Sequence, residues 1–463
     1  MDRLSELPDS VIFHIFWFLP IRDFVRTTIL SKRWKNLWTT TPFLNMTDHE
    51  RLSFDHKKFS SIVHRVLLRW DGVKVLKFKV KMHHFLSAYG DAHLWVRFAK
   101  MHEVEELYLH WRDLHLKRTG NNDHEVRWVP QYLYSCSSLK VLSIHTSYFR
   151  ITENVQWNHL KSLTIINGFG VTEDVINQIL CGSPQLEVLI LSLVESDESL
   201  HIRSTSLKEL SMNKHLHEAD DDSSTYTAEL RIWTPNLKTL EIKGIPYGKC
   251  LLMNVSSLTH VTLEYSNLHQ YDRTYCGDFP GIDDFLSSNH FLGDLFGQIL
   301  PNIQHVENVK LLPCCFKVLR AMIEGCMNLS SPNVKSIQFR FHCTFVGMIE
   351  IFPLSKKLFI EVGERVKSYC GEAYSLWASR HFYREFELHI PMSFMLQLRI
   401  VEVTLVEGDI LFPFLESLLK NASKLEKIVF RVKGSQNCLL HASQKLLKMP
   451  RSSRTAVFSF CEY

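Results

Sequence analysis

The residues that could carry chemistry are eleven cysteines, twenty-four histidines and a few acidic or glycine-containing stretches. No two cysteines have the Cys-x-x-Cys spacing of a zinc or redox site, and Cys314 and Cys315 are adjacent, so they point in different directions on most backbones. The stretch GFGVTE (168–173) has Glu173 where a dinucleotide-binding loop needs its third glycine. The acids and the histidine of HEVEE (102–106) are better explained as solvated turn residues. We therefore expect no catalytic residue, no metal site and no cofactor.

Composition and charge are those of an ordinary globular protein. The 463 residues are 45% hydrophobic and 22% charged, which is ordinary for a globular chain, and the length suggests two to four domains or one repeat array. The formal charge of +4 is slight for this size, and the densest basic run is KRWK at 32–35. Nucleic-acid binding needs a larger basic cluster, so we expect no nucleic-acid partner.

The stretch VIFHIFWFLP (11–20) is the most apolar part of the N-terminal region. A signal peptide needs a basic leader, whereas this leader holds three acids against one arginine, and no small-residue cleavage site follows. A membrane span needs about 20 apolar residues, and this block ends at Arg22 and Asp23. We therefore expect no membrane association, reduced cysteines, and a cytoplasmic or nuclear protein.

Three helices are predicted in this region, over 7–19, 21–31 and 32–38. The first is apolar around nearly its whole circumference, and in the second Phe24, Val25, Thr28 and Ile29 are expected to face inward. A unit of about 45 residues buries too little surface to cover so many apolar side chains alone. Either another protein or the rest of the chain must cover them, and the residues alone leave a self-contained three-helix cap equally open.

The stretch LSELPDSVIFHIFWFLPIRDFVRTTILSKRWKNLW resembles an F-box of the plant F-box/leucine-rich-repeat family. The shared features are LPD at 7–9, FLP at 18–20 and LSKRWKNLW at 30–38. The resemblance implies docking on a Skp-type adaptor of a cullin ubiquitin ligase. It also implies that the following residues face that adaptor or directly support the face: Leu7, Pro8, Val11, Ile12, Ile15, Leu19, Pro20, Val25, Leu30, Trp34 and Trp38. Trp17 stands where the family usually has a small polar residue, so it either alters the edge of the contact or packs on the following domain.

The rest of the chain repeats one phrase, L-x-x-L-x-L. It begins at 139, 160, 186, 207, 237 and 258, with looser copies at 73, 104, 306, 334, 398 and 425. The successive starts from 139 to 258 differ by 21, 26, 21, 30 and 21 residues, which matches leucine-rich repeats. The pattern predicts an α/β fold, with a three-helix F-box followed by a solenoid of parallel strands with helical or irregular returns and an αβ C-terminal cap.

Alternation within each phrase assigns side chains to two faces. The apolar positions face the core, and the intervening ones face outward, where solenoids bind their partners. The outward positions predicted to contact a target are Val141, Ser143, His145, Thr164, Ile166, Val188, Ile190, Ser211, Glu241, Lys243 and His260.

Four regions are expected: 1–46 (F-box), 60–265 (repeats), 266–390 (irregular continuation) and 391–463. The last resembles the FBD-type C-terminal region of the same family, especially in FLESLLKNASKLEKIVF (414–430), although PMSFML (391–396) replaces the usual lead-in. The acidic stretch EADDDSST (218–225) is expected to be a surface loop, and 290–300 a helix.

The resemblance implies the substrate-recognition subunit of a Skp–cullin–F-box ubiquitin ligase, with an unidentified protein target. One alternative is a leucine-rich-repeat scaffold or inhibitor that binds a partner without degradation. A small-ligand receptor ranks lower, because the outward set contains only one lysine, Lys243.

Overall fold

A computed structural model divides the chain into two compact units, Met1–Asp221 and Asp222–Tyr463. The structure describes residues 6–19, 21–47, 56–72, 74–82, 89–111, 129–145, 149–166, 170–194, 199–214, 228–244, 247–264, 295, 298–312, 335–341, 345–352, 355–365, 395–405, 412–432 and 436–462. Pro20 and the acidic stretch 218–225 lie outside these ranges, as does most of the predicted helix 290–300.

The first unit opens with the three predicted helices. They are α1 (Asp9–Phe18), α2 (Ile21–Arg26) continued by the 3-10 turn η1 (Thr27–Ile29), and α3 (Lys32–Leu37). Ser31 caps α3, because its hydroxyl accepts a hydrogen bond from the backbone N–H of Trp34 at 3.3 Å. The three elements are confirmed, but the prediction that Val25 and Ile29 face inward is wrong, since they are 41% and 84% exposed.

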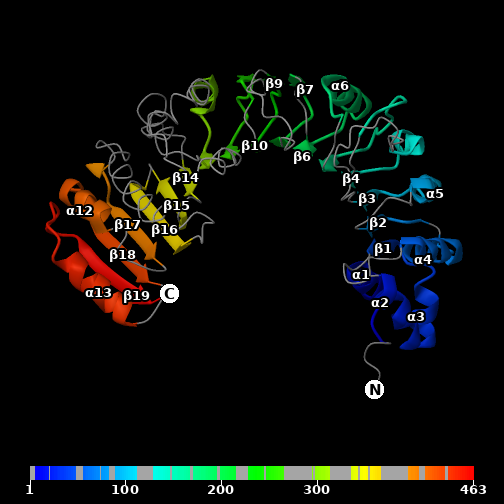
Figure 1. The fold of residues 1–463 in the computed structure, drawn as a ribbon, viewed down its shortest axis with the longest axis horizontal. Helices are drawn as coiled ribbons and strands as arrows, with labels where there is room; N and C mark the ends of the chain where they lie inside the picture. The colour runs from blue at the N-terminus through cyan, green and yellow to red at the C-terminus, as the bar shows by residue number, and fades with distance from the viewer. Residues whose placement is uncertain are drawn as a thin grey trace, which may run out of the picture. The chain divides into compact units, whose positions relative to one another are not determined.

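A parallel sheet follows in the first unit, with helices covering one of its faces (Figure 1). Its strands, each paired with the next, are β1 (Phe43–Thr47), β2 (Lys77–Met82), β3 (Glu106–Trp111), β4 (Val141–His145), β5 (Ser162–Ile166), β6 (Val188–Val194) and β8 (Glu209–Lys214). The connecting elements are α4 (His56–Arg69), α5 (Tyr89–Met101), the 3-10 turn η3 (Gln131–Ser135), α6 (Glu173–Gly182) and β7 (Leu200–Arg203).

The sheet begins earlier than the sequence pattern suggests. Strand β1 has no recognisable repeat phrase, yet it pairs with β2 and lies N-terminal to residue 60, where the repeats were expected to start. The phrase read at 73 is displaced by two residues. The Leu76 carbonyl accepts hydrogen bonds from Glu105 and Glu106, just as the Glu105 carbonyl accepts from the next repeat, so Val75 and not Val73 opens this phrase.

The core face of the repeats is confirmed. The eighteen residues predicted to face inward from the six clearest phrases are all at most 3% exposed: Leu139, Leu142, Ile144, Leu160, Leu163, Ile165, Leu186, Leu189, Leu191, Leu207, Leu210, Met212, Leu237, Leu240, Ile242, Leu258, Val261 and Leu263. Thr172 caps α6 as predicted, because its Oγ1 accepts from the Val175 N–H at 3.4 Å.

The second unit is also built on sheet strands. Its strands are β10 (Thr239–Gly244), β12 (His260–Glu264), β13 (Asn308–Leu312), β14 (Ser336–Phe341), β15 (Phe345–Phe352), β16 (Lys357–Arg365), β17 (Ile400–Leu405), β18 (Lys427–Val432) and β19 (Val457–Glu462). A separate parallel pair joins β9 (Glu229–Trp233) and β11 (Lys249–Met253), and the helical elements are η6 (Leu300–Ile303), α12 (Phe412–Asn421) and α13 (Gln436–Leu447). The predicted helix–strand order of the C-terminal region is confirmed.

One strand of the second unit breaks the parallel pattern. β15 pairs antiparallel with both β14 and β16, whereas the other strand pairs of this sheet are parallel. Tight chain reversals connect antiparallel strands without a helix. Strands β15 and β16, which lie where the repeat phrase fades, therefore continue the sheet with a different strand direction.

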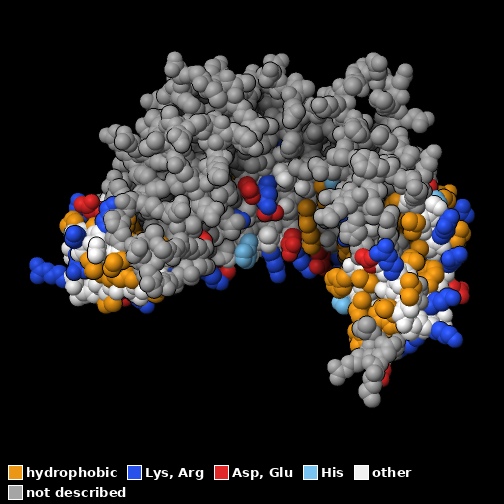
Figure 2. All heavy atoms as spheres, turned by 60° about the horizontal axis from the view of Figure 1, so that its bottom comes forward, with side chains coloured by type: hydrophobic (Ala, Val, Ile, Leu, Met, Phe, Trp, Pro, Cys, Tyr) orange, Lys and Arg blue, Asp and Glu red, His pale blue; other side chains and the backbone are white. Residues whose placement is uncertain are grey.

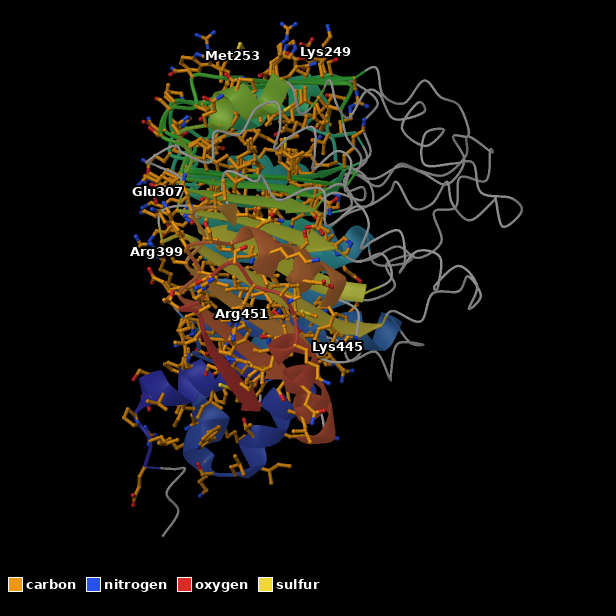
Figure 3. All side chains as sticks on the ribbon, turned by 90° about the vertical axis from the view of Figure 1, so that its left-hand side faces the viewer. Lys249, Met253, Glu307, Arg399, Lys445 and Arg451 are labelled. Atoms are coloured by element: carbon orange, nitrogen blue, oxygen red, sulfur yellow. The ribbon has the colours of Figure 1, made fainter. Side chains whose placement is uncertain are left out.

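Charged side chains form ion pairs between neighbouring repeats at the edge where the strands begin. They follow the first apolar residue of each phrase: Glu187 pairs with Lys208 (3.0 Å), Glu307 with Lys335 (2.7 Å) and Arg399 with Glu426 (3.0 Å). Figure 3 shows Glu307 and Arg399 along the same edge of the second unit. These contacts join adjacent repeats at solvent-exposed positions, so each contributes only about 0–1 kcal/mol.

Candidate protein-binding faces

The N-terminal helices share a small core. Ile12 and Phe16 of α1 and Trp34 of α3 are at most 2% exposed, and the rings of Phe16 and Trp34 meet edge to face at 5.5 Å. An ion pair between Arg33 and Asp9 also joins α3 to α1. These contacts fix α1 and α3 against each other, and several other apolar side chains of the block lie outside this small core.

Five large apolar side chains of this block stay exposed. Their exposed fractions are 42% for Val11, 68% for Phe18, 41% for Val25, 84% for Ile29 and 53% for Leu30. Figure 2 shows hydrophobic side chains gathered over this N-terminal part of the chain. Covering such side chains contributes about 1.5–3 kcal/mol each, so the surface suits a protein partner.

The structure divides the predicted adaptor residues by exposure. Pro8, Val11, Val25 and Leu30 are exposed, whereas Leu7, Ile15, Leu19 and Trp38 are half-buried. Ile12 and Trp34 are buried, which leaves them a supporting role only. Their contact with an adaptor stays a prediction.

Two exposed side chains were missed. Phe18 and Ile29 lie beside predicted positions, and Ile29 follows Val25 by four residues on one helical face. The periodicity of 21–31 identified this face but could not say whether it points to the core or to solvent.

Trp17 packs on the sheet of the same unit. Its ring lies 6.0 Å from that of Tyr108 on β3, and the ammonium of Lys77 on β2 lies 5.7 Å from its centroid. Asn45 of β1 donates a hydrogen bond to the Trp17 carbonyl at 2.6 Å. Trp17 thus anchors α1 to the first three strands, which is the second of its two predicted roles.

The outward face carries the predicted target residues. In the first unit, parallel register places Ser143 beside Thr164, and Thr164 beside Ile190, but Ser143 is buried at 7% exposure with its hydroxyl against His110. The other predicted residues of this unit also lie at outward positions: Val141, His145, Ile166, Val188 and Ser211. In the second unit, Glu241 and Lys243 form an ion pair at 2.7 Å, and His260 is exposed at the start of β12. No observation tests their contact with a target.

The sequence pattern missed a group of basic residues on this face. Lys77, Lys79 and Lys81 alternate along β2 and therefore point outward together. Register places Lys81 beside His110 of β3, and His110 beside His145 of β4. The count of a single outward lysine, Lys243, was limited to the six clearest phrases and left out the looser phrase at 73, which leads into the strand that carries these lysines. Alternation places Lys77 and Lys79 outward at either alignment of this phrase, because a shift of two residues keeps side chains on the same face.

Desolvation and like charges act on this group. Burial lowers the pKa of Lys79, and the charge of Lys81 lowers it further. Burial also lowers the pKa of His110 to about 4, with added effects of His145, Lys79 and Lys81. The His110 Nε2 lies 2.8 Å from the Ser143 hydroxyl, which fixes the ring against β4.

The described His, Cys, Asp and Glu side chains are dispersed over the structure. No three His, Cys, Asp or Glu side chains among the described residues are placed to hold a metal ion. None of the helices within the described ranges is long and apolar enough to span a bilayer. Burial raises the pKa of the Cys136 and Cys250 thiols to about 12, the opposite of an activated nucleophile.

Comparison with known proteins matches both parts of this arrangement. A family model described as the F-box domain matches residues 4–46, and one described as "FBD-associated F-box protein At5g56370, LRR repeats" matches residues 92–223. The molecule is thus an F-box protein with leucine-rich repeats.

Arabidopsis thaliana proteins resemble longer stretches. The F-box/LRR-repeat protein At5g02910 is 28% identical over 67% of this chain and 59% of its own length. The F-box/FBD/LRR-repeat protein At5g56420 is 25% identical over 73% of this chain and 77% of its own. The putative F-box/LRR-repeat protein At5g02930 is 25% identical over 93% of this chain and 87% of its own. Over these stretches the chain resembles plant F-box proteins with leucine-rich repeats.

Proposed function

We propose that this protein is the substrate-recognition subunit of a Skp–cullin–F-box ubiquitin ligase and acts in the cytoplasm or nucleus. The N-terminal helices would bind the Skp-type adaptor, and the outward face of the repeats would bind a target protein. The observation that carries the proposal is the exposed apolar surface of Val11, Val25 and Leu30 inside the matched F-box. Holding a target next to the ligase raises the local concentration of its lysines, so no residue of this chain need react.

The adaptor contact is tested with Val11→Asp/Leu30→Asp in the full chain. A charge in a desolvated apolar contact is strongly unfavourable, so we expect adaptor capture to fall at least about tenfold. Affinity capture of a purified Skp-type adaptor measures this, and circular dichroism checks the fold.

The matched control is Leu68→Asp on α4, where an apolar side chain is 85% exposed outside the F-box. It should capture the adaptor as the wild type does. If the wild type captures no adaptor, the protein is better described as a leucine-rich-repeat scaffold. Equal losses in both variants would also contradict the assigned face.

We also propose the boundaries 1–46, 60–265, 266–390 and 391–463 for the F-box, the main repeats, their continuation and an FBD-like region. The order of elements in the last region, α12–β18–α13–β19, supports that part.

A further inference from the structure

The outward face of the first five strands carries an uneven distribution of charge. From β1 to β5 the outward positions are Phe43, Asn45, Thr47, Lys77, Lys79, Lys81, Glu106, Tyr108, His110, Val141, Ser143, His145, Ser162, Thr164 and Ile166. Three are lysines and two are histidines, whereas Glu106 alone is acidic. This face therefore has an excess of basic groups, and its positive charge at pH 7 lies on the lysines of β2, because burial lowers the pKa of His110 on β3 to about 4.

The single acid of this face is already engaged. Glu106 accepts from the Tyr108 hydroxyl at 2.9 Å and forms an ion pair with Lys77 at 2.9 Å. Lys79 and Lys81 form no ion pair with any carboxylate of the described residues. We call Lys79, Lys81, His110 and His145 the β2–β4 basic patch.

On the outward face of the second unit, basic side chains form ion pairs with carboxylates. Glu402 of β17 receives Lys357 of β16 at 2.7 Å and Arg431 of β18 at 3.0 Å. Lys243 of β10 lies 2.7 Å from Glu241 and 3.8 Å from Glu264. Neighbouring strands there supply carboxylates to their basic residues, so pairing across strands is available to this fold. Its absence around Lys79 and Lys81, within the described part of the sheet, marks the β2–β4 basic patch as different.

The pKa shifts agree with this geometry. The patch is partly desolvated, and its basic groups lower one another's pKa. A negatively charged group placed among them would relieve both effects, because it replaces lost water and offsets the repulsion.

The surroundings of the patch suit a polypeptide. Trp17 and Tyr108 form an aromatic border on one side, and the half-buried Thr164 lies on β5 beyond the His110–Ser143 contact. Lys79 and Lys81 are two residues apart on one strand, a spacing of about 7 Å, which is also the distance between alternate side chains of an extended peptide. Aromatic, polar and charged groups at this spacing match an extended segment with acidic side chains at every second position.

We propose that the β2–β4 basic patch binds an extended acidic segment of the target protein, in which Asp or Glu alternates with other residues. This inference rests on the proposed function, since it names the chemistry of the target that the repeats recognise. Because Trp17 packs beside the patch, the bound segment lies next to the N-terminal helices that hold the adaptor.

The test uses the full-length protein and a fluorescein-labelled peptide with four glutamates alternating with glycines. The matched probe has glutamine at the same four positions. We expect fluorescence anisotropy to show binding of the glutamate peptide only, with affinity falling between 50 and 200 mM salt because the contacts are electrostatic. Equal binding of both peptides, or no binding of either, would overturn the proposal.

Variants locate the site. Lys79→Gln/Lys81→Gln should weaken binding of the glutamate peptide by about tenfold or more, and Lys79→Arg/Lys81→Arg should restore it, because arginine keeps the charge. The control Lys238→Gln/Lys249→Gln removes the same charge from exposed positions off the patch; Figure 3 labels Lys249 on β11. A loss as large in the control would assign the binding to net charge and contradict a local site.

Two further measurements separate the possible outcomes. Tripolyphosphate is the probe for a free anion, and tight binding of it without binding of the peptide would refute a peptide ligand. Adaptor capture by Lys79→Gln/Lys81→Gln should equal that of the wild type. If the protein binds the glutamate peptide but neither the wild type nor any variant captures the adaptor, the result contradicts the proposed ligase function and supports the acidic-segment site.

Discussion

At the residue scale, His110 shows that the outward face changes the pKa of a side chain relative to its value in solvent. Its imidazole is held between β2 and β4, where burial and then the charges of His145, Lys79 and Lys81 bring its pKa to about 4. In the unfolded chain a histidine titrates near pH 6.5. Between these values the unfolded state binds more protons, so the folded protein loses stability as the pH falls from about 6.5 to about 4.

We expect His110→Gln to remove this part of the pH dependence. The wild type should lose roughly 1–2 kcal/mol more than the variant between pH 7 and pH 4.5, since only the wild type has this proton to take up on unfolding. Urea unfolding midpoints at several pH values measure the difference. The control is His159→Gln at an exposed position, and an identical fall in both variants would show that His110 is not responsible.

Trp17 had two predicted roles, at the edge of the adaptor contact or in packing on the following domain, and its contacts support the second. A sequence alone shows a large aromatic in a position that the family fills with a small polar residue. The structure adds the ring of Tyr108 at 6.0 Å and the ammonium of Lys77 at 5.7 Å, both on strands far along the chain. A cation–π contact of this kind contributes about 0.5–1 kcal/mol at an exposed site.

At the element scale, the end of α6 packs closely against residues 155–157 of the preceding repeat. Gly182 is the last residue of this helix, and its carbonyl accepts a hydrogen bond from the Trp157 N–H at 2.9 Å. A Cβ added to Gly182 would lie 2.4 Å from the carbonyl oxygen of Val155 and 2.5 Å from its Cβ. The oxygen is a backbone atom and the Cβ is attached directly to the backbone, so neither atom can rotate away.

Gly182→Ala should therefore destabilise the first unit by about 1–3 kcal/mol, the usual cost of overpacking. Cys181→Ala is the matched control, because Cys181 is exposed one position earlier on the same helix. A urea denaturation midpoint for each variant compares the two. If the midpoints coincide, α6 does not pack against Val155 as closely as described.

Two elements illustrate what alternation can and cannot predict. The phrases from 104 onward each begin two residues before a strand, and the strands β3 to β18 that contain them follow that rule. The phrase read at 73 begins two residues too early. The stretch VKVLKFKV (73–80) fits the apolar pattern from Val73 and from Val75, and both starts place the same side chains on the same face of the strand. Strand β1 has the buried Leu44 and Met46 at the two strand positions of the phrase, but Thr41 stands where the first apolar residue belongs, so the phrase is not recognised.

At the scale of the whole molecule, the surfaces proposed for the adaptor and for the target lie on different parts of the first unit. The exposed apolar residues lie on α1, α2 and η1 with Leu30, whereas the β2–β4 basic patch lies on the sheet. The two activities can therefore be removed one at a time.

The adaptor-deficient variant Val11→Asp/Leu30→Asp should act as a trap in cells. It keeps the outward face, so it binds the target without delivering it to the ligase, and we expect the captured target to exceed the wild-type amount several-fold. Quantitative mass spectrometry of affinity-captured material measures this, and proteasome inhibition should bring the wild type to the same level. A target recovered equally from both proteins without the inhibitor would contradict turnover by this route.

The sequence by itself determined the helical N-terminal block, the parallel strands of the clear repeats, their buried leucines and the helix–strand order of the C-terminal region. These depend on local periodicity, because a strand buries alternate side chains and a helix buries every third or fourth. Only the tertiary structure decided the register of β2, the exposure of Val25 and Ile29 and the site against which Trp17 packs. A periodic pattern is unchanged by a shift of one full period and does not say what covers a face, so these features depend on contacts between residues distant in the sequence.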